Sequence, residues 1–336
     1  MRVAVLGAGS WGTAFAIHLN KLGFSVKVWE YFPENVSIIS KTHRNPLLPG
    51  IPIPPAIFVS NDISEVVNDC EVIVVAVPSH TVRKVLEGIK GRTNGKIIVN
   101  LSKGIEEDTL LRMSQVIHQV LEHPYNMIVT LHGPSHAEEV AREIPTCVVA
   151  ASTDMETARF VQEQFMTTYF RIYRTIDIIG VEIGGAIKNV IAIAAGICDG
   201  LALGDNSKAA LITRGLFEIT RMGVKLGAWE QTFAGLSGVG DLIVTCNSRY
   251  SRNRYIGEEI GKGRKLQDVL SGMTMVAEGV RTCHTVHQMS KKYKVSMPIS
   301  EQVYKILFED KSPREALIEL MTRDPVEERH SLPEIL

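Results

Sequence analysis

Short apolar runs alternate with helical segments over the first half of the chain. The runs have the composition of buried strands and cover residues 2–6, 26–29, 71–77, 96–100, 127–131, 146–151 and 170–175. Helical segments separate most of them, including residues 109–121 and 155–166. Because such alternation builds a largely parallel sheet with helices on both faces, residues 1 to about 178 predict a doubly wound α/β domain.

The pattern changes after Asp177. Strand signals nearly vanish, and helical periods dominate to about Met321. We therefore expect two domains, an α/β domain of residues 1–180 and an all-helical domain of residues 181–336.

The helical domain opens with an unusual segment, residues 181–206, whose apolar periodicity predicts one long helix buried over most of its circumference. It is rich in glycine and alanine, and each interior glycine costs roughly 1 kcal/mol against alanine, so close packing or a ligand must compensate. Lys188 stands in its middle. A buried lysine has a lowered pKa suited to proton transfer, whereas the alternative is a lysine that reaches solvent at the helix edge. Its place at the domain junction favours the first interpretation, because clefts form there.

A glycine-rich loop, Gly7-Ala8-Gly9-Ser10-Trp11-Gly12, follows the first strand and precedes a helix. Glycines let the backbone approach a pyrophosphate, and the helix N-terminus offers it free N–H groups. The second strand ends at Glu30, about twenty residues on, where an acidic residue can hold an adenosine ribose. The unit predicts a Rossmann-type dinucleotide site; a glycine turn without a ligand is the alternative.

Polar residues follow the other predicted strands. Pro78, Lys103 and Gly133 lie just past strand ends, where doubly wound sheets bind their ligands. Ser135 and Glu138 have the spacing of a capping box, which predicts a helix start with free N–H groups at the same edge.

Two clusters in the helical domain carry candidate chemistry. Ser251-Arg252-Asn253 opens a helix with a hydroxyl cap and a guanidinium, as a phosphate site requires, although a solvated basic helix start has the same pattern. Asp241 follows two nearby glycines and precedes an apolar run. Its carboxylate can hold Lys188 charged and oriented, or it can cap a helix.

Composition and charge narrow the function classes. The chain has 336 residues, a net charge of −1 and 45% hydrophobic residues, which indicates a globular protein without the basic face of a nucleic-acid binder. We expect no signal peptide and no membrane span. Five scattered cysteines without a CxxC motif favour a reducing cytoplasm without disulfides. A metal site is not expected, because Pro134 separates His132 from His136 and no HExxH motif occurs.

Eight motifs in order resemble the NAD(P)-dependent glycerol-3-phosphate dehydrogenase family of bacteria, over about residues 1–325. They are GAGSWGTA at Gly7, NPLLPGIPIPP at Asn45, LSKGIE at Leu101, HGPSHAEEVA at His132, GGAIKNVIAIAAGICDGLALGDN at Gly184, GLSGVGDLIVTC at Gly235, SRNRYIG at Ser251 and VAEGV at Val276.

The resemblance implies reversible hydride transfer between NAD(P)H and dihydroxyacetone phosphate, giving sn-glycerol 3-phosphate for glycerophospholipid synthesis. It assigns proton transfer to Lys188, the carboxylate beside the substrate hydroxyl to Asp241, and shared substrate and cofactor contact to Lys103. The other implied substrate contacts are Gly133, Ser135, Ser251, Arg252 and Asn253. The other implied cofactor contacts are Ser10, Trp11, Ala137, Arg252, Val276 and Glu278. A homodimer is also implied.

Two departures from the family pattern matter. Many members carry a basic or neutral pair after the second strand, which suits the NADP phosphate, whereas this chain has Glu30-Tyr31. The acidic side chain repels that phosphate, so NAD is the expected cofactor and NADP the second choice. His132 and His136 stand where the family more often has a small residue and a phenylalanine.

Two other function classes remain open at this stage. A related two-domain dehydrogenase acting on a hydroxyacid or sugar acid needs similar cationic groups. A non-catalytic dinucleotide sensor needs the glycine loop, but it has no need of a placed lysine and carboxylate. Lysine, carboxylate and phosphate pocket together favour an enzyme over a sensor, and the expected substrate is a small phosphorylated molecule.

Overall fold

The computed structural model describes residues 1–273 and 278–328. An eight-stranded sheet forms the N-terminal part, in the order β3-β2-β1-β4-β5-β6-β7-β8. The strands are β1 (Arg2–Leu6), β2 (Ser25–Trp29), β3 (Phe58–Ser60), β4 (Val72–Val75), β5 (Ile97–Asn100), β6 (Ile128–His132), β7 (Thr146–Ala151) and β8 (Phe170–Thr175). Neighbouring strands are parallel except β6 and β7, which pair antiparallel with Thr130 opposite Ala151. This confirms the predicted sheet; the sequence analysis missed only the three-residue edge strand β3.

Helices cover both faces of this sheet. They are α1 (Ser10–Lys21), α2 (Pro33–Thr42), α3 (Ile63–Val67), α4 (Val82–Glu87), α5 (Met113–Leu121), α6 (Ala137–Val140) and α7 (Met155–Phe165). Successive residues of β1 enter opposite cores: Val3 and Val5 pack with α1 and α7, whereas Ala4 and Leu6 pack with α4 and α5. The predicted helix at residues 109–121 begins only at Met113, because the preceding residues form a turn that an Ile105–Arg112 bridge closes.

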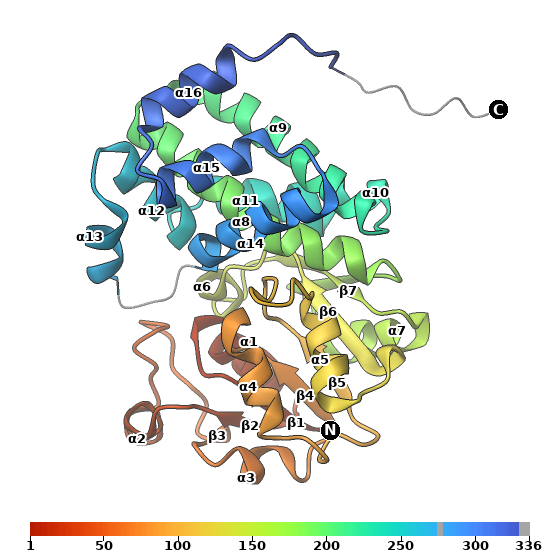
Figure 1. The fold of residues 1–336 in the computed structure, drawn as a ribbon. Coiled ribbons are helices and arrows are strands. Elements are labelled where there is room, and N and C mark those ends of the chain that lie inside the picture. The colour runs from red at the N-terminus through yellow and green to blue at the C-terminus, as the bar shows by residue number, and fades with distance from the viewer. Residues whose placement is uncertain (274–277, 329–336) are drawn as a thin grey trace, which may run out of the picture.

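The C-terminal part is helical. It contains α8 (Ile178–Gly200), α9 (Gly204–Lys225), α10 (Glu230–Phe233), a π-helical turn (Leu236–Gly240), α11 (Asp241–Asn247), α12 (Arg252–Gly261), α13 (Leu266–Ser271), α14 (Glu278–Tyr293), α15 (Pro298–Phe308) and α16 (Pro313–Met321). Figure 1 shows these helices stacked on one end of the sheet, with α8 in their midst. The sheet followed by helices confirms the predicted fold class.

The segment predicted as one helix over residues 181–206 is two helices. α8 ends at Gly200 because Ala202 takes the left-handed conformation (φ 56°), and the N–H of Leu203 bonds back to the oxygen of Cys198 at 3.1 Å. Gly204, with φ 79°, then begins α9. The predicted burial is confirmed, since every residue from Gly180 to Cys198 is buried.

The glycines of α8 permit a close crossing with α12. A Cβ on Gly196 would lie 1.9 Å from the backbone oxygen of Arg254, and one on Gly257 would lie 1.9 Å from that of Ile193. The contact is therefore reciprocal, backbone against backbone, and each helix needs its glycine. Close packing thus compensates for the low helix propensity of these residues.

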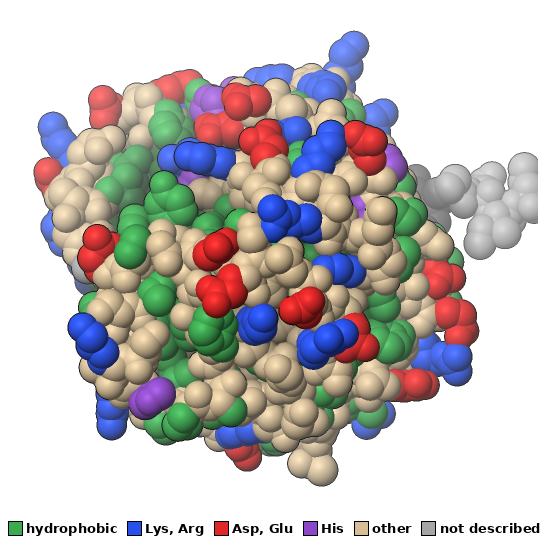
Figure 2. Space-filling model, turned by 90° about the horizontal axis from the view of Figure 1, so that it is seen from below, with side chains coloured by type: hydrophobic (Ala, Val, Ile, Leu, Met, Phe, Trp, Pro, Cys, Tyr) green, Lys and Arg blue, Asp and Glu red, His purple; other side chains and the backbone are tan. Residues whose placement is uncertain are grey.

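By length and composition α8 is apolar enough to cross a membrane, but 94% of its apolar window is buried inside the protein, as in a core helix. Figure 2 shows acidic and basic side chains interspersed over the face seen from below. That face carries no broad basic surface of the kind that nucleic acids bind.

Candidate active site

Two lysines from different parts of the chain meet one carboxylate at the carboxyl edge of the sheet. Lys188, in the middle of α8, donates a hydrogen bond to Oδ1 of Asp241. Lys103, in the loop after β5, donates to Oδ2 of the same residue at 2.8 Å. Lys188 and Asp241 are buried, which excludes an edge lysine, and the Asp241 side chain binds ammonium groups instead of capping α11.

The charges in this cluster depend on one another. Burial lowers the pKa of Lys188 to about 7, although the charge of Asp241 opposes the shift. For Asp241, burial favours a raised pKa, but the two ammonium groups outweigh it and the pKa is lowered. The site therefore keeps an anionic carboxylate beside a lysine that gains or loses a proton near neutral pH, as general acid–base catalysis requires.

Thr245 completes the surroundings of Lys188. Its hydroxyl lies 2.8 Å from Nζ and donates to the backbone oxygen of Asp241 at 2.6 Å. The sequence analysis missed this residue. The signal was present, because Thr245 is four residues after Asp241 on a helix, and that spacing places both side chains on one face.

The strand end at Gly133 receives the second contact of Lys103. Its carbonyl oxygen accepts from Nζ of Lys103 at 3.1 Å and from the hydroxyl of Ser135 at 3.0 Å. The predicted capping box is therefore wrong: α6 begins after His136, without a side-chain cap, and the Ser135 hydroxyl is turned back to Gly133. Ala137 is the first, buried residue of the helix.

His136 borders the same region. Burial is the main cause that lowers its pKa to about 4, so the ring is neutral. Its Nε2 is buried and has no hydrogen-bond partner among the described residues, and the ring lies 5.9 Å from that of Tyr250.

The segment predicted to bind phosphate, Ser251-Arg252-Asn253, lies at the start of α12. Ser251 caps α12 as predicted, accepting from the N–H of Arg254 at 3.2 Å. Arg252 is exposed at the first helical position, and the buried Asn253 accepts from the N–H of Gly279 with its Oδ1 at 3.0 Å. Nε of Arg254 donates to Asp199 at 2.6 Å. The guanidinium of Arg254 is therefore engaged within the helical part of the chain.

The glycine loop has the shape that a dinucleotide needs. Gly7 has φ 110°, and a Cβ there would lie 2.9 Å from the oxygen of Ala76. A Cβ on Gly12 would lie 2.0 Å from the oxygen of Gly7, whereas one on Gly9 would meet nothing within 4 Å. Ser10 donates to the oxygen of Leu47 at 2.6 Å, and Nε1 of Trp11 is buried without a partner among the described residues. An open approach at Gly9 beside an unsatisfied indole N–H fits a dinucleotide pyrophosphate.

Glu30 is buried at the end of β2. Its Oε1 accepts from the N–H of Phe32 at 3.0 Å and from the amide of Asn35 at 3.4 Å, so the carboxylate also holds the turn before α2. Tyr31 is 60% exposed.

Glu278 joins the helical part to the sheet. Its Oε1 accepts from the N–H of Ser79, in the turn after β4, at 3.1 Å. Burial raises the pKa of Glu278, while that bond and the charge of Arg252 act against the shift. Val276, which the family resemblance marks as a cofactor contact, lies outside the described residues.

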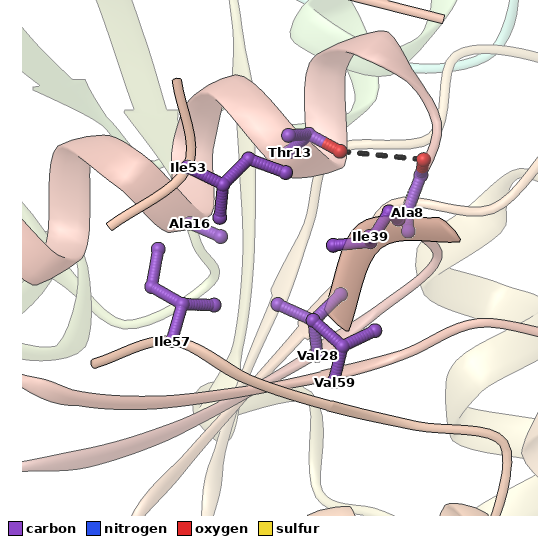
Figure 3. Close-up of a pocket in the computed structure, with 8 residues that line it drawn as sticks. All are labelled: Ala8, Thr13, Ala16, Val28, Ile39, Ile53, Ile57 and Val59. Carbon is purple, nitrogen blue, oxygen red and sulfur yellow. Dashed lines mark hydrogen bonds between the residues drawn. The ribbon is translucent and has the colours of Figure 1, made fainter. Parts of the chain in front are cut away.

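A small apolar pocket lies behind the glycine loop, between α1, α2 and the strand edge (Figure 3). Its lining residues are Ala8, Thr13, Ala16, Val28, Ile39, Ile53, Ile57 and Val59. The Thr13 hydroxyl is bonded to the oxygen of Ala8 at 3.3 Å, so the pocket offers a ligand little polar contact and acts as packing behind the loop. Over residues 1–273 and 278–328, no group of three or more His, Cys, Asp or Glu could hold a metal ion.

Known proteins match this chain over most of its length. The profile described as NAD-dependent glycerol-3-phosphate dehydrogenase N-terminus matches residues 2–158, and the C-terminus profile matches residues 177–318. Glycerol-3-phosphate dehydrogenase (NAD(P)+) of Thermoanaerobacter sp. strain X514 is 50% identical over 99% of this chain and 100% of its own length. The protein of that name from Chlorobium phaeobacteroides strain BS1 is 52% identical over 98% of this chain and 99% of its own length. Glycerol-3-phosphate dehydrogenase from Coxiella burnetii superimposes with a TM-score of 0.92 at 35% identity, over 96% of this chain and 99% of that one.

Proposed function

The chain belongs to the NAD-dependent glycerol-3-phosphate dehydrogenase family, and we propose that it transfers a hydride reversibly between NAD(P)H and dihydroxyacetone phosphate, with sn-glycerol 3-phosphate as the reduced product. The observation that carries this proposal is the carboxylate of Asp241 shared by Lys188 and Lys103, at the sheet edge that the glycine loop also borders.

Lys188 acts as the proton donor in reduction and as the proton acceptor in oxidation. When bound, the nicotinamide supplies the hydride. Negative charge then builds on the substrate oxygen, and the Lys188 ammonium stabilises it and donates the proton. Asp241 keeps Lys188 oriented. Lys103, which is bonded to the other oxygen of Asp241, contributes a second positive charge beside the substrate oxygen.

The phosphate of the substrate binds at the start of α12. Ser251, Arg252 and Asn253 supply a helix N-terminus and a guanidinium for it. Gly133 and Ser135 border the reacting end, because Lys103 is bonded to the Gly133 oxygen.

The dinucleotide binds along the glycine loop. Gly7, Gly9 and Gly12 shape the approach of the pyrophosphate. Glu30 accepts from a ribose hydroxyl, so NADH is preferred to NADPH. The remaining cofactor contacts are Ser10, Trp11, Tyr31, Lys103, Ala137, Arg252, Val276 and Glu278.

The roles of the two domains, the cellular location and the oligomeric state are proposed from the family resemblance. Residues 1–180 bind the dinucleotide and residues 181–336 complete the substrate site. The protein works in the cytoplasm as a homodimer and supplies the glycerol backbone of phospholipids.

The test is NADH oxidation upon addition of dihydroxyacetone phosphate, beside a panel of 2-keto acids and unphosphorylated dihydroxyacetone. We expect saturable turnover with the phosphorylated ketone at the highest kcat/KM. A preference for a 2-keto acid would indicate a hydroxyacid dehydrogenase. Tight NADH binding without turnover on any substrate would indicate a dinucleotide sensor.

A further inference from the structure

We propose that His132 is a positioning residue that holds the loop of Lys103 and the helix of Lys188 in register around Asp241. This inference rests on the proposed function, since it concerns the same two lysines. His132 is the last residue of β6 and is buried.

Both ring nitrogens of His132 face backbone carbonyls on different elements. Nε2 lies 3.3 Å from the oxygen of Ser102, the residue directly before Lys103. Nδ1 lies 3.3 Å from the oxygen of Val181, on α8. The imidazole therefore spans from the loop after β5 to the helix that carries the proton donor.

A second contact runs between the same two strand ends in the opposite direction. Nζ of Lys103 donates to the oxygen of Gly133, the residue directly after His132. The ring of His132 thus faces the 102–103 pair, while the ammonium group of Lys103 is bonded to the 132–133 pair, so the two pairs meet through both side chains. Loss of the imidazole contact leaves Lys103 as the only side chain of these two pairs that bridges them.

The ring also lies against the backbone of α8. A Cβ on Gly185 would be 2.6 Å from Nδ1 of His132. Gly185 precedes Lys188 by three residues, so the ring rests on the helix one turn before the proton donor. The ring of His132 therefore requires a glycine at position 185, independently of the crossing of α8 with α12.

The protonation state limits what the ring of His132 can bond. Burial lowers the pKa of His132 to about 3, and the positive charge of Lys103 acts in the same direction. A neutral imidazole has one N–H, so it bonds one of the two carbonyls, while its other nitrogen faces an oxygen without a bond. An apolar side chain fills such a space without this mismatch. The ring therefore hydrogen-bonds one of the two lysine-bearing elements at a time, and its packing against Gly185 keeps it in contact with α8.

Loss of the ring has a specific electrostatic effect. The loop of Lys103 gains freedom to move away from α8, and Lys103 is one of the groups that lower the pKa of Lys188. Among the charged and titratable groups around Lys188, Asp241 raises that pKa, and His132 and His136 are neutral. Glu278, which is bonded to Ser79, stays with α14. The pKa of Lys188 should therefore rise when Lys103 withdraws.

The experiment compares His132→Leu, His132→Gln and Gly185→Ala with the wild type, using dihydroxyacetone phosphate and NADH across pH. His132→Leu should lower kcat on the order of 10- to 100-fold and move the alkaline limb of the reduction profile to higher pH. His132→Gln keeps a donor toward Ser102 and should recover part of kcat. Gly185→Ala, which displaces the ring without altering it, should act in the same direction as His132→Leu.

His18→Leu is the matched control. His18 is also a buried histidine facing a backbone carbonyl, with Nε2 2.7 Å from the oxygen of Phe165, but it lies on α1 away from the lysines. The His18→Leu variant should lower the melting temperature and leave the pH profile of the reaction unchanged. Wild-type kcat and pH profile in both His132→Leu and Gly185→Ala would overturn the inference, and Gly185→Ala decides alone if His132→Leu does not fold. Absence of wild-type turnover would contradict the proposed function instead.

Discussion

The hydroxyl of Thr245 accepts a hydrogen bond from Nζ of Lys188 at 2.8 Å, so the ammonium has a neutral partner as well as a charged one. Removal of this acceptor destabilises the charged form of Lys188. Thr245→Val should therefore move the alkaline limb of dihydroxyacetone phosphate reduction down by about one to two pH units, since a hydrogen bond to a charged group contributes about 1.5–3 kcal/mol. Thr245→Ser keeps the hydroxyl and serves as the control. Identical profiles for the valine and serine variants would contradict the role of this hydroxyl.

The pKa of Lys188, lowered to about 7, predicts opposite pH dependence for the two reaction directions. Reduction needs the protonated lysine, so kcat/KM should fall as pH rises above about 7. Oxidation of glycerol 3-phosphate needs the neutral lysine, so it should fall as pH drops below about 7.

Lys188→Ala tests the same group by removing it. The variant should lose roughly 10²- to 10⁴-fold in kcat with little change in NADH affinity. Lys188→Arg should recover little, because a guanidinium keeps its proton. Near-normal turnover of Lys188→Ala would end the assignment, and loss of NADH binding would make the lysine structural.

Arg252 carries the guanidinium assigned to the substrate phosphate. Arg252→Ala should reduce kcat/KM for dihydroxyacetone phosphate by roughly 30- to 1000-fold, or about 2–4 kcal/mol, and should affect unphosphorylated dihydroxyacetone weakly. Arg254→Ala is a useful comparison, because Arg254 is bonded to Asp199 and should alter stability more than substrate choice. Equal losses on both substrates in Arg252→Ala would place the phosphate elsewhere.

Glu30 is assigned the choice between the two cofactors. Glu30→Gln retains an acceptor for the N–H of Phe32 but removes the charge that repels a 2′-phosphate. The ratio of kcat/KM for NADH over NADPH should fall roughly tenfold, or about 1.4 kcal/mol. A wild-type enzyme that clearly favours NADPH would show that Glu30 does not set this preference.

His18 predicts a loss of stability in acid. Burial is the main cause that lowers its pKa to about 4, from the 6.5 of an unfolded chain. The unfolded state therefore binds the proton first as pH falls, and stability decreases between about pH 6.5 and pH 4. Between pH 7 and pH 4.5 this histidine should contribute a loss on the order of 2–3 kcal/mol in the free energy of unfolding.

His18→Gln is the variant that tests this effect. It retains a donor for the oxygen of Phe165 but does not titrate, so its loss between the two pH values should be smaller in urea unfolding. A decrease as large as that of the wild type would show that His18 does not drive it.

The sequence was sufficient for the features that depend on local pattern. Alternating strands and helices, the glycine loop and the Ser251 cap follow from periodicity and residue type, and the structure contains them. The π-helical turn before Asp241 and the edge strand β3 were missed, because both are short and depend on tertiary contacts.

Other features of the site needed three-dimensional packing. Ser135 has capping-box spacing, yet its hydroxyl donates to the backbone oxygen of Gly133, and α6 begins only after His136. Sequence spacing could not show that Lys103 and Lys188, 85 residues apart in number, share one carboxylate. Nor could it show that Arg254, two residues after Arg252, is bonded to Asp199.

Backbone meets backbone where α8 crosses α12, at Gly196 and Gly257, so no flexible side chain lies between the two helices to absorb a change in their spacing. Lys188 stands on one helix and Arg252 begins the other. The crossing therefore fixes how far apart the main chains that carry these two side chains lie. Under the proposed function, we expect substitutions at Gly196 or Gly257 to change which lengths of phosphorylated ketone the enzyme accepts.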